Sequence, residues 1–210
     1  GGVNYALHFR AVTGDIRYFR DSEWKFFTAV LILAAIAVTS LNFFAGDASG
    51  EKAIRDGLFQ VLAITTTTGY VSADYELWVP GARMVLFSLF FLGGMAGSTS
   101  GGVKALRVML LLKQAANELR RHLHPRAVLV TRIGNKPVTE DVAARIISFL
   151  MLYLLLCMAG ALALAMTGIE PLTAISGSIA SVGNVGPSFA GLGPTDNYGW
   201  MSETGLGVLT

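Results

Sequence analysis

Charged side chains are scarce in this sequence of 210 residues, where Asp, Glu, Lys and Arg together make up 14%. A soluble globular protein carries roughly 25%, and here hydrophobic residues reach 53% with a mean hydropathy of +0.56. A disordered chain is also excluded, because it needs low hydrophobicity and high net charge. The composition therefore predicts an integral membrane protein.

Cysteine is almost absent. The one cysteine, Cys157, stands in an apolar run, which excludes a disulfide framework and a cysteine-rich metal site. His122 and His124 have no further ligands beside them and are expected at the surface. The loop at 97–104 lacks the Gly-Lys-Ser/Thr ending of a phosphate-binding loop. With no nucleophile–base pair either, we expect no enzyme and no cofactor, and the net charge of +2 is too small to indicate nucleic-acid binding.

Long apolar runs are present instead. A spanning helix needs about 20 mostly apolar residues, and such runs occur at 24–45, 79–112 and 146–166. The second run is interrupted at 93–102, where five of the ten residues are glycine. A fourth run starts near Trp200, and the sequence does not open with methionine. We therefore expect a piece of a longer polypeptide.

Two shorter segments lie between the long runs. Residues 50–64 and 171–181 have apolar residues at helical spacing, and each leads into a polar stretch that contains glycine. Aligning Gly69 with Gly186 sets the two units 117 residues apart. Each unit reads spanning helix, short helix, polar stretch, spanning helix, which predicts an internal repeat.

The polar stretches are poor material for a helix. Four threonines precede Gly69, and β-branched residues followed by glycine favour an extended backbone whose carbonyls face one way. Non-helical backbone at membrane depth survives only inside protein or beside a water-filled cavity. Rows of carbonyls there can replace the water shell of a potassium ion. For either stretch alone, an ordinary extracellular loop with turn glycines stays an alternative.

Basic residues are unevenly distributed. Of the 16 Lys and Arg residues, four precede residue 26 and nine lie at 104–145, while none follows Arg145. The positive-inside rule then predicts that the N-terminus and residues 104–145 are cytoplasmic and that both short helices are on the outer side.

Five features together resemble one family. They are the stretch 65–70, the glycine-rich loop with its basic exit at 93–104, residues 110–113, the His124-Pro125 step and the stretch 181–187. These resemble the Trk/Ktr/HKT superfamily of cation transporters, and most closely its bacterial TrkH-type potassium-uptake subunits. The resemblance implies an all-α integral membrane fold. It consists of helix–pore-helix–helix repeats of potassium-channel type, with re-entrant filter loops and a broken helix.

The resemblance also implies how the chain is divided. We expect a cytoplasmic segment at 1–23, a third pore repeat at 24–112, a cytoplasmic basic linker at 113–140 and a fourth pore repeat at 141–210, truncated in its last span. The filter residues carried over are Thr66, Thr67, Thr68, Gly69, Tyr70, Gly183, Asn184, Val185, Gly186 and Pro187. The gate-loop residues are Gly93, Gly94, Gly97, Ser98, Thr99, Ser100, Gly101, Gly102 and Lys104. The only metal expected is potassium, at the filter and as substrate.

As a whole, the resemblance implies potassium uptake across the bacterial inner membrane by a multi-pass protein. A single-file filter of backbone carbonyls would select the ion, and the glycine-rich loop would gate it. A second copy of the subunit and a cytoplasmic nucleotide-binding regulatory subunit of the TrkA type would be its partners beside the lipid bilayer. Sodium transport stays an alternative, and so does a membrane anchor or scaffold. An ion-coupled secondary transporter, with substrate at the broken helix, is disfavoured because the three complete runs contain no carboxylate.

Overall fold

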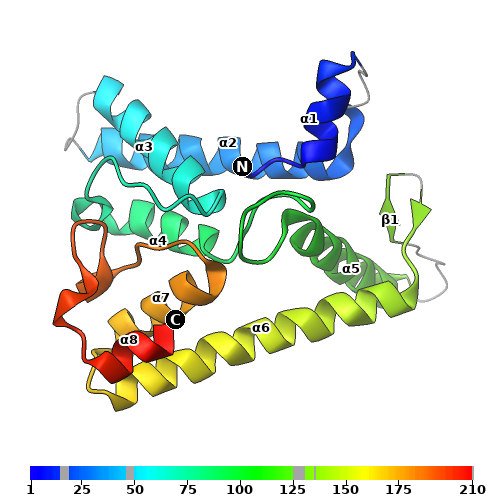
Figure 1. The fold of residues 1–210 in the computed structure, drawn as a ribbon. Helices are drawn as coiled ribbons and strands as arrows, with labels where there is room; N and C mark the ends of the chain where they lie inside the picture. Colours follow the sequence, from blue (N-terminus) through cyan, green and yellow to red (C-terminus); the bar gives the residue numbers. More distant parts are fainter. Residues whose placement is uncertain (15–18, 46–49, 125–130, 135, 210) are drawn as a thin grey trace.

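The computed structural model describes residues 1–14, 19–45, 50–124, 131–134 and 136–209, and the regular structure there is almost all helix (Figure 1). Residues 15–18, 46–49, 125–130, 135 and 210 lie outside this description, including parts of the predicted N-terminal segment and basic linker. The elements in chain order are α1 (Tyr5–Val12), α2 (Ser22–Phe44), α3 (Gly50–Thr65), η2 (Tyr75–Leu77), α4 (Pro80–Leu89), α5 (Ala105–Leu123), β1 (Arg132–Ile133), β2 (Lys136–Pro137), α6 (Glu140–Met166), α7 (Pro171–Gly183), η3 (Ala190–Leu192), η4 (Tyr198–Trp200) and α8 (Glu203–Leu209).

Two of the predicted spans are continuous helices. Among the described residues, α2 and the part of α6 from Asp141 onward are long and apolar enough to cross a membrane. Both begin earlier than the apolar runs do. Asp21 starts α2 because its side chain accepts a hydrogen bond from the amide of Trp24 at 2.9 Å. In α2 the capping residue, and not the start of the apolar run, therefore marks where the helix begins.

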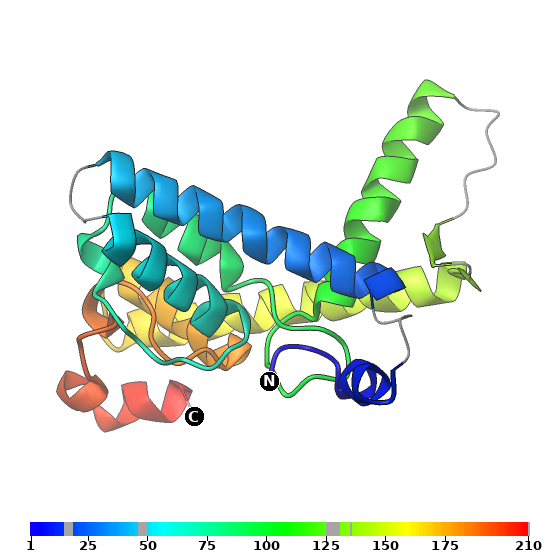
Figure 2. The same ribbon diagram turned by 90° about the horizontal axis from the view of Figure 1, so that it is seen from above.

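The remaining complete span is broken, as its glycines predicted. Helix α4 ends at Leu89, and no regular structure follows until α5 starts at Ala105. Beyond the predicted end of this run at residue 112, α5 continues to Leu123. It projects away from the helices around it at a steep angle to α2 (Figure 2). The predicted linker at 113–140 therefore begins as helix.

The two repeats lie side by side. Helix α3 packs against α2, α7 packs against α6, and α4 and α7 lie between the two long helices (Figure 1). One buried apolar cluster joins the repeats, and it includes Phe27 and Ile64 of the first together with Tyr153 and Ile179 of the second. The spanning-helix and short-helix units expected from the sequence are thus packed around a shared core.

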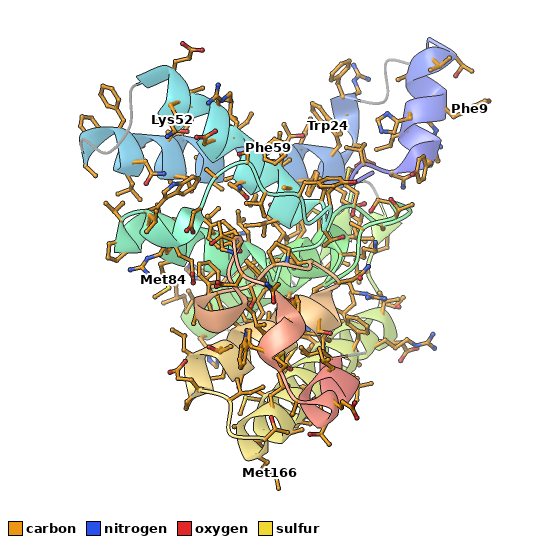
Figure 3. The ribbon with its side chains drawn as sticks, turned by 60° about the vertical axis from the view of Figure 1, so that its left-hand side comes forward. Phe9, Trp24, Lys52, Phe59, Met84 and Met166 are labelled. Atoms are coloured by element: carbon orange, nitrogen blue, oxygen red, sulfur yellow. The ribbon has the colours of Figure 1, made fainter. Side chains whose placement is uncertain are left out.

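The short helix α3 buries polar side chains beside apolar ones. Ile54 and Leu58 are about half exposed, at 52% and 43%, whereas Asp56 and Gln60 are buried together with Val61. Large apolar side chains also cover the outside of the bundle, as Phe59, Met84 and Met166 show (Figure 3). Burying apolar surface drives assembly in water but not in lipid, where small and polar groups form helix contacts. This inverted pattern suits a membrane protein.

Candidate functional site

The chain leaves α3 and α7 by the same backbone turn. Thr67 and Asn184 are both left-handed, with φ of 51° and 55°, and the glycines two residues later have φ of 73° and 104°. In each turn an amide returns to a carbonyl five residues earlier, from Thr68 to Ala63 at 2.9 Å and from Val185 to Ala180 at 2.8 Å. Every equivalent pair is 117 residues apart, so the predicted repeat and its register are confirmed in the backbone geometry.

The extended conformation expected for these stretches is wrong at their starts. Thr65 is the last residue of α3, and α7 continues through Val182 to Gly183. The left-handed residues then let the returning amides bond to the last helical carbonyls, as in glycine-type helix caps. Capping satisfies groups that an extended backbone would leave without partners.

The two glycine turns, residues 66–70 and 183–187, meet each other. A Cβ on Gly69 would lie 2.3 Å from the carbonyl oxygen of Val185 and 3.4 Å from Cδ of Pro187. Val185 is buried at 3% exposure, whereas Tyr70 is 71% exposed. The hydroxyl of Tyr198 donates to the carbonyl of Gly186 at 2.7 Å. The structure thus brings the candidate filter residues of both repeats together.

The threonine hydroxyls mostly bond within the protein. Those of Thr65 and Thr66 donate to carbonyls one helical turn earlier, at 2.8 and 2.7 Å. The Thr66 and Thr68 hydroxyls share a bond of 2.7 Å, and the Thr67 hydroxyl accepts from the amide of Gly101 at 2.8 Å. Their oxygens stabilise the turn in this structure, so the backbone carbonyls are the better candidates for contacting an ion.

The glycine-rich loop, residues 93–104, is closed by its own hydrogen bonds. The amide of Gly93 donates to the carbonyl of Val103 at 2.7 Å, and the amide of Ala105 donates to that of Gly94 at 3.0 Å. A serine pairs with one of the freed backbone groups, since the amide of Gly94 donates to the hydroxyl of Ser100 at 2.8 Å. The loop is therefore an ordered structure with internal bonds.

The same loop touches both glycine turns. Besides the bond from Gly101 to the hydroxyl of Thr67, a Cβ on Gly101 would lie 2.4 Å from the carbonyl oxygen of Gly183. One loop residue thus contacts the end of each short helix. Segments separated by more than 30 and 80 residues in the chain meet at one place.

Glu23 is a residue of the site that the sequence did not indicate. It precedes the first apolar run, but α2 already starts at Ser22, so Glu23 belongs to the spanning helix. Its side chain is only 7% exposed, and its Oε1 accepts from the amides of Ala96 at 2.6 Å and Leu106 at 3.1 Å. The helix as it forms therefore carries a buried carboxylate one residue before the apolar run, although the run itself contains none. The available signal was a glutamate two residues after a helix-capping aspartate.

A basic side chain contacts the loop as well. The ammonium group of Lys104, a predicted loop residue, donates to the carbonyl of Ser98 at 3.2 Å and to that of Ser100. The hydroxyl of Ser98 donates to the carbonyl of Met95 at 2.6 Å. The N-terminal residues add a further contact, since the amide of Met95 donates to the carbonyl of Gly2 at 2.8 Å.

The connections beyond the glycine turns are also joined. Tyr75 is fully buried and its hydroxyl donates to the carbonyl of Ser188 at 2.6 Å. The carboxylate of the neighbouring Glu76 accepts from the amide of Ala190, and burial raises the pKa of this carboxyl above its usual value. These bonds link the loop of the first repeat to that of the second, just past the glycine turns.

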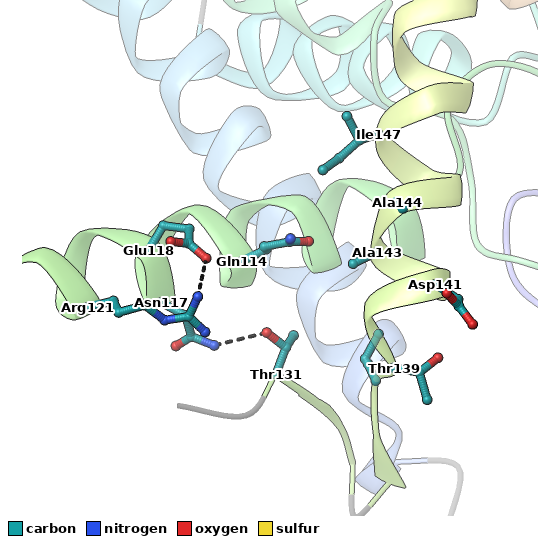
Figure 4. A pocket seen from close by; sticks show the side chains of 11 residues that line it. Gln114, Asn117, Glu118, Arg121, Thr131, Thr139, Asp141, Ala143, Ala144 and Ile147 are labelled. Atoms are coloured by element: carbon teal, nitrogen blue, oxygen red, sulfur yellow. Dashed lines mark hydrogen bonds and ion pairs between the residues drawn. The ribbon is translucent and has the colours of Figure 1, made fainter. Parts of the chain in front are cut away.

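A separate polar cavity of about 750 Å³ lies between α5, α6 and the residues that flank the paired strands β1 and β2 (Figure 4). The side-chain Nδ2 of Asn117 donates to the hydroxyl of Thr131 at 3.0 Å, and Arg121 pairs with Glu118 at 3.0 Å. Over the described parts of the chain, no group of three or more His, Cys, Asp or Glu could hold a metal ion. The candidate site is therefore not this cavity but the place where the glycine-rich loop meets the two glycine turns.

Comparisons with known proteins find relatives that match nearly the whole chain. The family model described as TrkH, cation transport protein, matches residues 1–198. The Trk system potassium uptake protein TrkH of Escherichia coli is 34% identical over 99% of this chain and 43% of its own length. The Trk system potassium uptake protein TrkI of Halomonas elongata is 32% identical over 100% of this chain and 43% of its own length. The chain thus spans less than half the length of these curated relatives.

A solved structure is similar to this fold. The crystal structure of the potassium transporter TrkH from Vibrio parahaemolyticus aligns with a TM-score of 0.90 and 31% sequence identity. The alignment covers 98% of this chain and 45% of that chain. The arrangement of helices described above is therefore that of a known membrane transporter.

Proposed function

The chain belongs to the TrkH family of cation transport proteins, which are not enzymes, and from this premise we propose that it forms part of a pore for potassium uptake. In this proposal a dehydrated potassium ion passes the backbone carbonyls of the two glycine turns. The observation that carries the proposal is the convergence of three segments: the two turns meet at Gly69 and Val185, and Gly101 contacts both short helices.

A carbonyl filter requires backbone groups that are free of helix partners and held in fixed positions. The capping turns supply both conditions, since their own amides bond back into α3 and α7. Two equivalent turns at a repeat spacing favour a filter over two unrelated loops. The names of the relatives, potassium uptake proteins, favour potassium as the ion.

We propose that the glycine-rich loop is the gate. Because Gly101 packs against the carbonyl of Gly183, the loop would lie on the inner side of the filter, where an ion leaves it. A loop between two separate helices, α4 and α5, can move without breaking either helix. In the conformation of this structure the loop would be closed.

The orientation and the partners are proposals of the same kind. The distribution of basic residues supports a cytoplasmic N-terminus and a cytoplasmic basic segment at 104–145, in the bacterial inner membrane. The family resemblance supports a homodimer and a regulatory subunit of the TrkA type. Arg120, Arg121 and His122, exposed at the end of α5, would offer such a subunit a basic surface.

Ion flux tests the function. We would reconstitute the full-length protein that carries this sequence into liposomes and measure rubidium uptake, with sodium as the competitor. Rubidium uptake that sodium does not inhibit supports a potassium pore, whereas equal uptake of sodium supports the sodium alternative. No uptake of either cation refutes the proposal.

The gate is tested in the same liposomes. Deleting residues 95–101 removes the loop contact below the turns, and the uptake rate is expected to rise. In Gly101→Ala the new Cβ meets the Gly183 carbonyl oxygen at 2.4 Å, so the loop must move and a smaller rise is expected. A rate equal to that of the wild type in both variants contradicts the gate assignment.

A further inference from the structure

The glycine-rich loop has backbone groups that no helix satisfies. At membrane depth such groups need partners within the protein, because lipid offers none. Several are paired inside the loop, but the amide of Ala96 and the carbonyls of Ser98 and Ser100 bond to charged side chains. Glu23 accepts the hydrogen bond from the amide of Ala96, and Lys104 donates to the carbonyls of Ser98 and Ser100.

Glu23, in α2, joins the loop to α2 and α5. Its Oε1 accepts from Ala96, inside the loop, and from Leu106, in the first turn of α5, at 2.6 and 3.1 Å. The first amides of a helix have no intrahelical partner, and the N-cap residue of α5, Lys104, makes no side-chain cap. A single oxygen of the Glu23 carboxylate, from α2, thus caps the start of α5 and also holds the loop at Ala96.

Lys104 is the last residue of the loop, and its side chain turns back over the residues before it. Its ammonium donates to the carbonyl of Ser98 at 3.2 Å and to that of Ser100, and it lies 3.3 Å from the Ser100 hydroxyl. An ammonium has three donors and no acceptor, so loop carbonyls and hydroxyls are suitable partners. Hydrogen bonds from or to charged groups are roughly twice as strong as neutral ones.

We propose that Glu23 and Lys104 form a charged latch that keeps the glycine-rich loop closed against the two glycine turns. The inference rests on the proposed function and names the residues that regulate its gate. In this proposal, opening requires the amide of Ala96 to leave Glu23 and the carbonyls of Ser98 and Ser100 to leave Lys104 at the end of the loop. Glu23 is nearly inaccessible to water, which therefore cannot readily replace the lost bonds.

The test uses charge-removing variants of the full-length protein in liposomes. Glu23→Gln keeps the size of the side chain and removes its charge, and Lys104→Met removes the ammonium while keeping an unbranched chain. Each is expected to raise rubidium uptake per folded protein at least threefold. The matched controls are Lys25→Met, on the exposed side of α2, and Glu118→Gln, on the exposed part of α5, which are expected to leave uptake unchanged.

A second measurement follows the loop itself. Met95 is fully buried within the loop, so a cysteine introduced as Met95→Cys reports loop opening once the modification of the same protein without this cysteine, in which Cys157 is buried, has been subtracted. Its rate of modification by a water-soluble thiol reagent is expected to rise at least threefold when Glu23→Gln or Lys104→Met is added. Normalising to the folded fraction from size-exclusion chromatography removes any effect of poor folding.

The outcomes separate the latch from the pore. Higher uptake together with faster modification in both latch variants supports the proposal. Uptake that stays level or falls while the wild type conducts, or modification at the wild-type rate, overturns it. If the wild-type protein takes up no cation, the proposed function fails, and the modification rate alone still decides whether Glu23 and Lys104 hold the loop.

Discussion

Replacing Gly69 with alanine tests whether the contact between the two glycine turns sets ion selectivity. Gly69 has a φ of 73°, a left-handed conformation in which a side chain costs roughly 1–2 kcal/mol. The added Cβ would also lie 2.3 Å from the carbonyl oxygen of Val185, which is backbone and cannot rotate away. The two turns must therefore separate by roughly 1 Å to reach ordinary van der Waals contact.

Such a shift matters because a filter replaces the water shell of an ion by fixed oxygens. We take this strain of roughly 1–2 kcal/mol as the free energy by which the displaced carbonyl changes the preference of the site for one cation over another. Because 1.4 kcal/mol corresponds to a factor of ten, the relative binding of the two cations should change about tenfold. We expect Gly69→Ala to lower the ratio of rubidium to sodium uptake in liposomes by about this factor.

Gly168 supplies the matched control. It has a φ of 88°, and nothing lies within 4 Å of the Cβ that alanine would add. Gly168→Ala therefore carries the backbone strain alone and should reduce thermal stability without changing the uptake ratio. For Gly186→Ala we expect a change in uptake ratio between those of Gly69→Ala and Gly168→Ala. Its φ is 104°, and the nearest atom to the added Cβ is Cα of Gly69 at 3.9 Å. An unchanged uptake ratio in Gly69→Ala would refute the filter assignment.

Three further substitutions test the packing around the site by thermal unfolding in detergent. Tyr75→Phe removes the bond to the Ser188 carbonyl and should cost about 1 kcal/mol; an unchanged melting temperature would mean that this bond does not join the repeats. Because burial raises the pKa of Glu76, its charged form destabilises the fold near neutral pH, and protonation relieves this as the pH falls through the raised pKa. Glu76→Gln keeps an acceptor for Ala190, so near pH 7 its melting temperature should equal or slightly exceed that of the wild type. The difference in free energy of unfolding should stay below about 1 kcal/mol and shrink as the pH falls. A difference that grows on acidification would contradict the raised pKa. Gly160→Ala places a Cβ 2.4 Å from a serine hydroxyl of α7 and should destabilise by about 1–3 kcal/mol, so a wild-type melting curve would show that α6 and α7 can move apart freely.

The helices and the repeat could be predicted from the sequence because lipid makes their signals strong. A run of about 20 apolar residues is typical of a helix that crosses a bilayer, and five glycines in ten residues at 93–102 are incompatible with an uninterrupted helix. The spacing between Gly69 and Gly186 was also sufficient to set the register of the repeat, since both have positive φ in equivalent turns. Local composition determines these features.

The contacts of the site could not be predicted in the same way. Glu23 bonds to residues 73 and 83 positions later in the chain, and nothing beside it in the sequence indicates this. The helix extents were missed for a related reason, because Asp21 sets the start of α2 by a capping bond rather than by hydropathy. Long-range partners and capping bonds depend on the fold, and apolar patterns do not record them.

The glycines of the loop have a different role from the one that composition suggests. Five glycines in ten residues indicate a segment that changes conformation at little steric cost. In the structure, however, a Cβ on Gly93, Gly94 or Gly101 would lie 2.2, 2.6 or 2.4 Å from a backbone oxygen. These three residues are glycines because the backbone is too closely packed for any side chain. Larger residues there should therefore disfavour the closed loop, so that a substitution expected to stiffen the segment would open the gate.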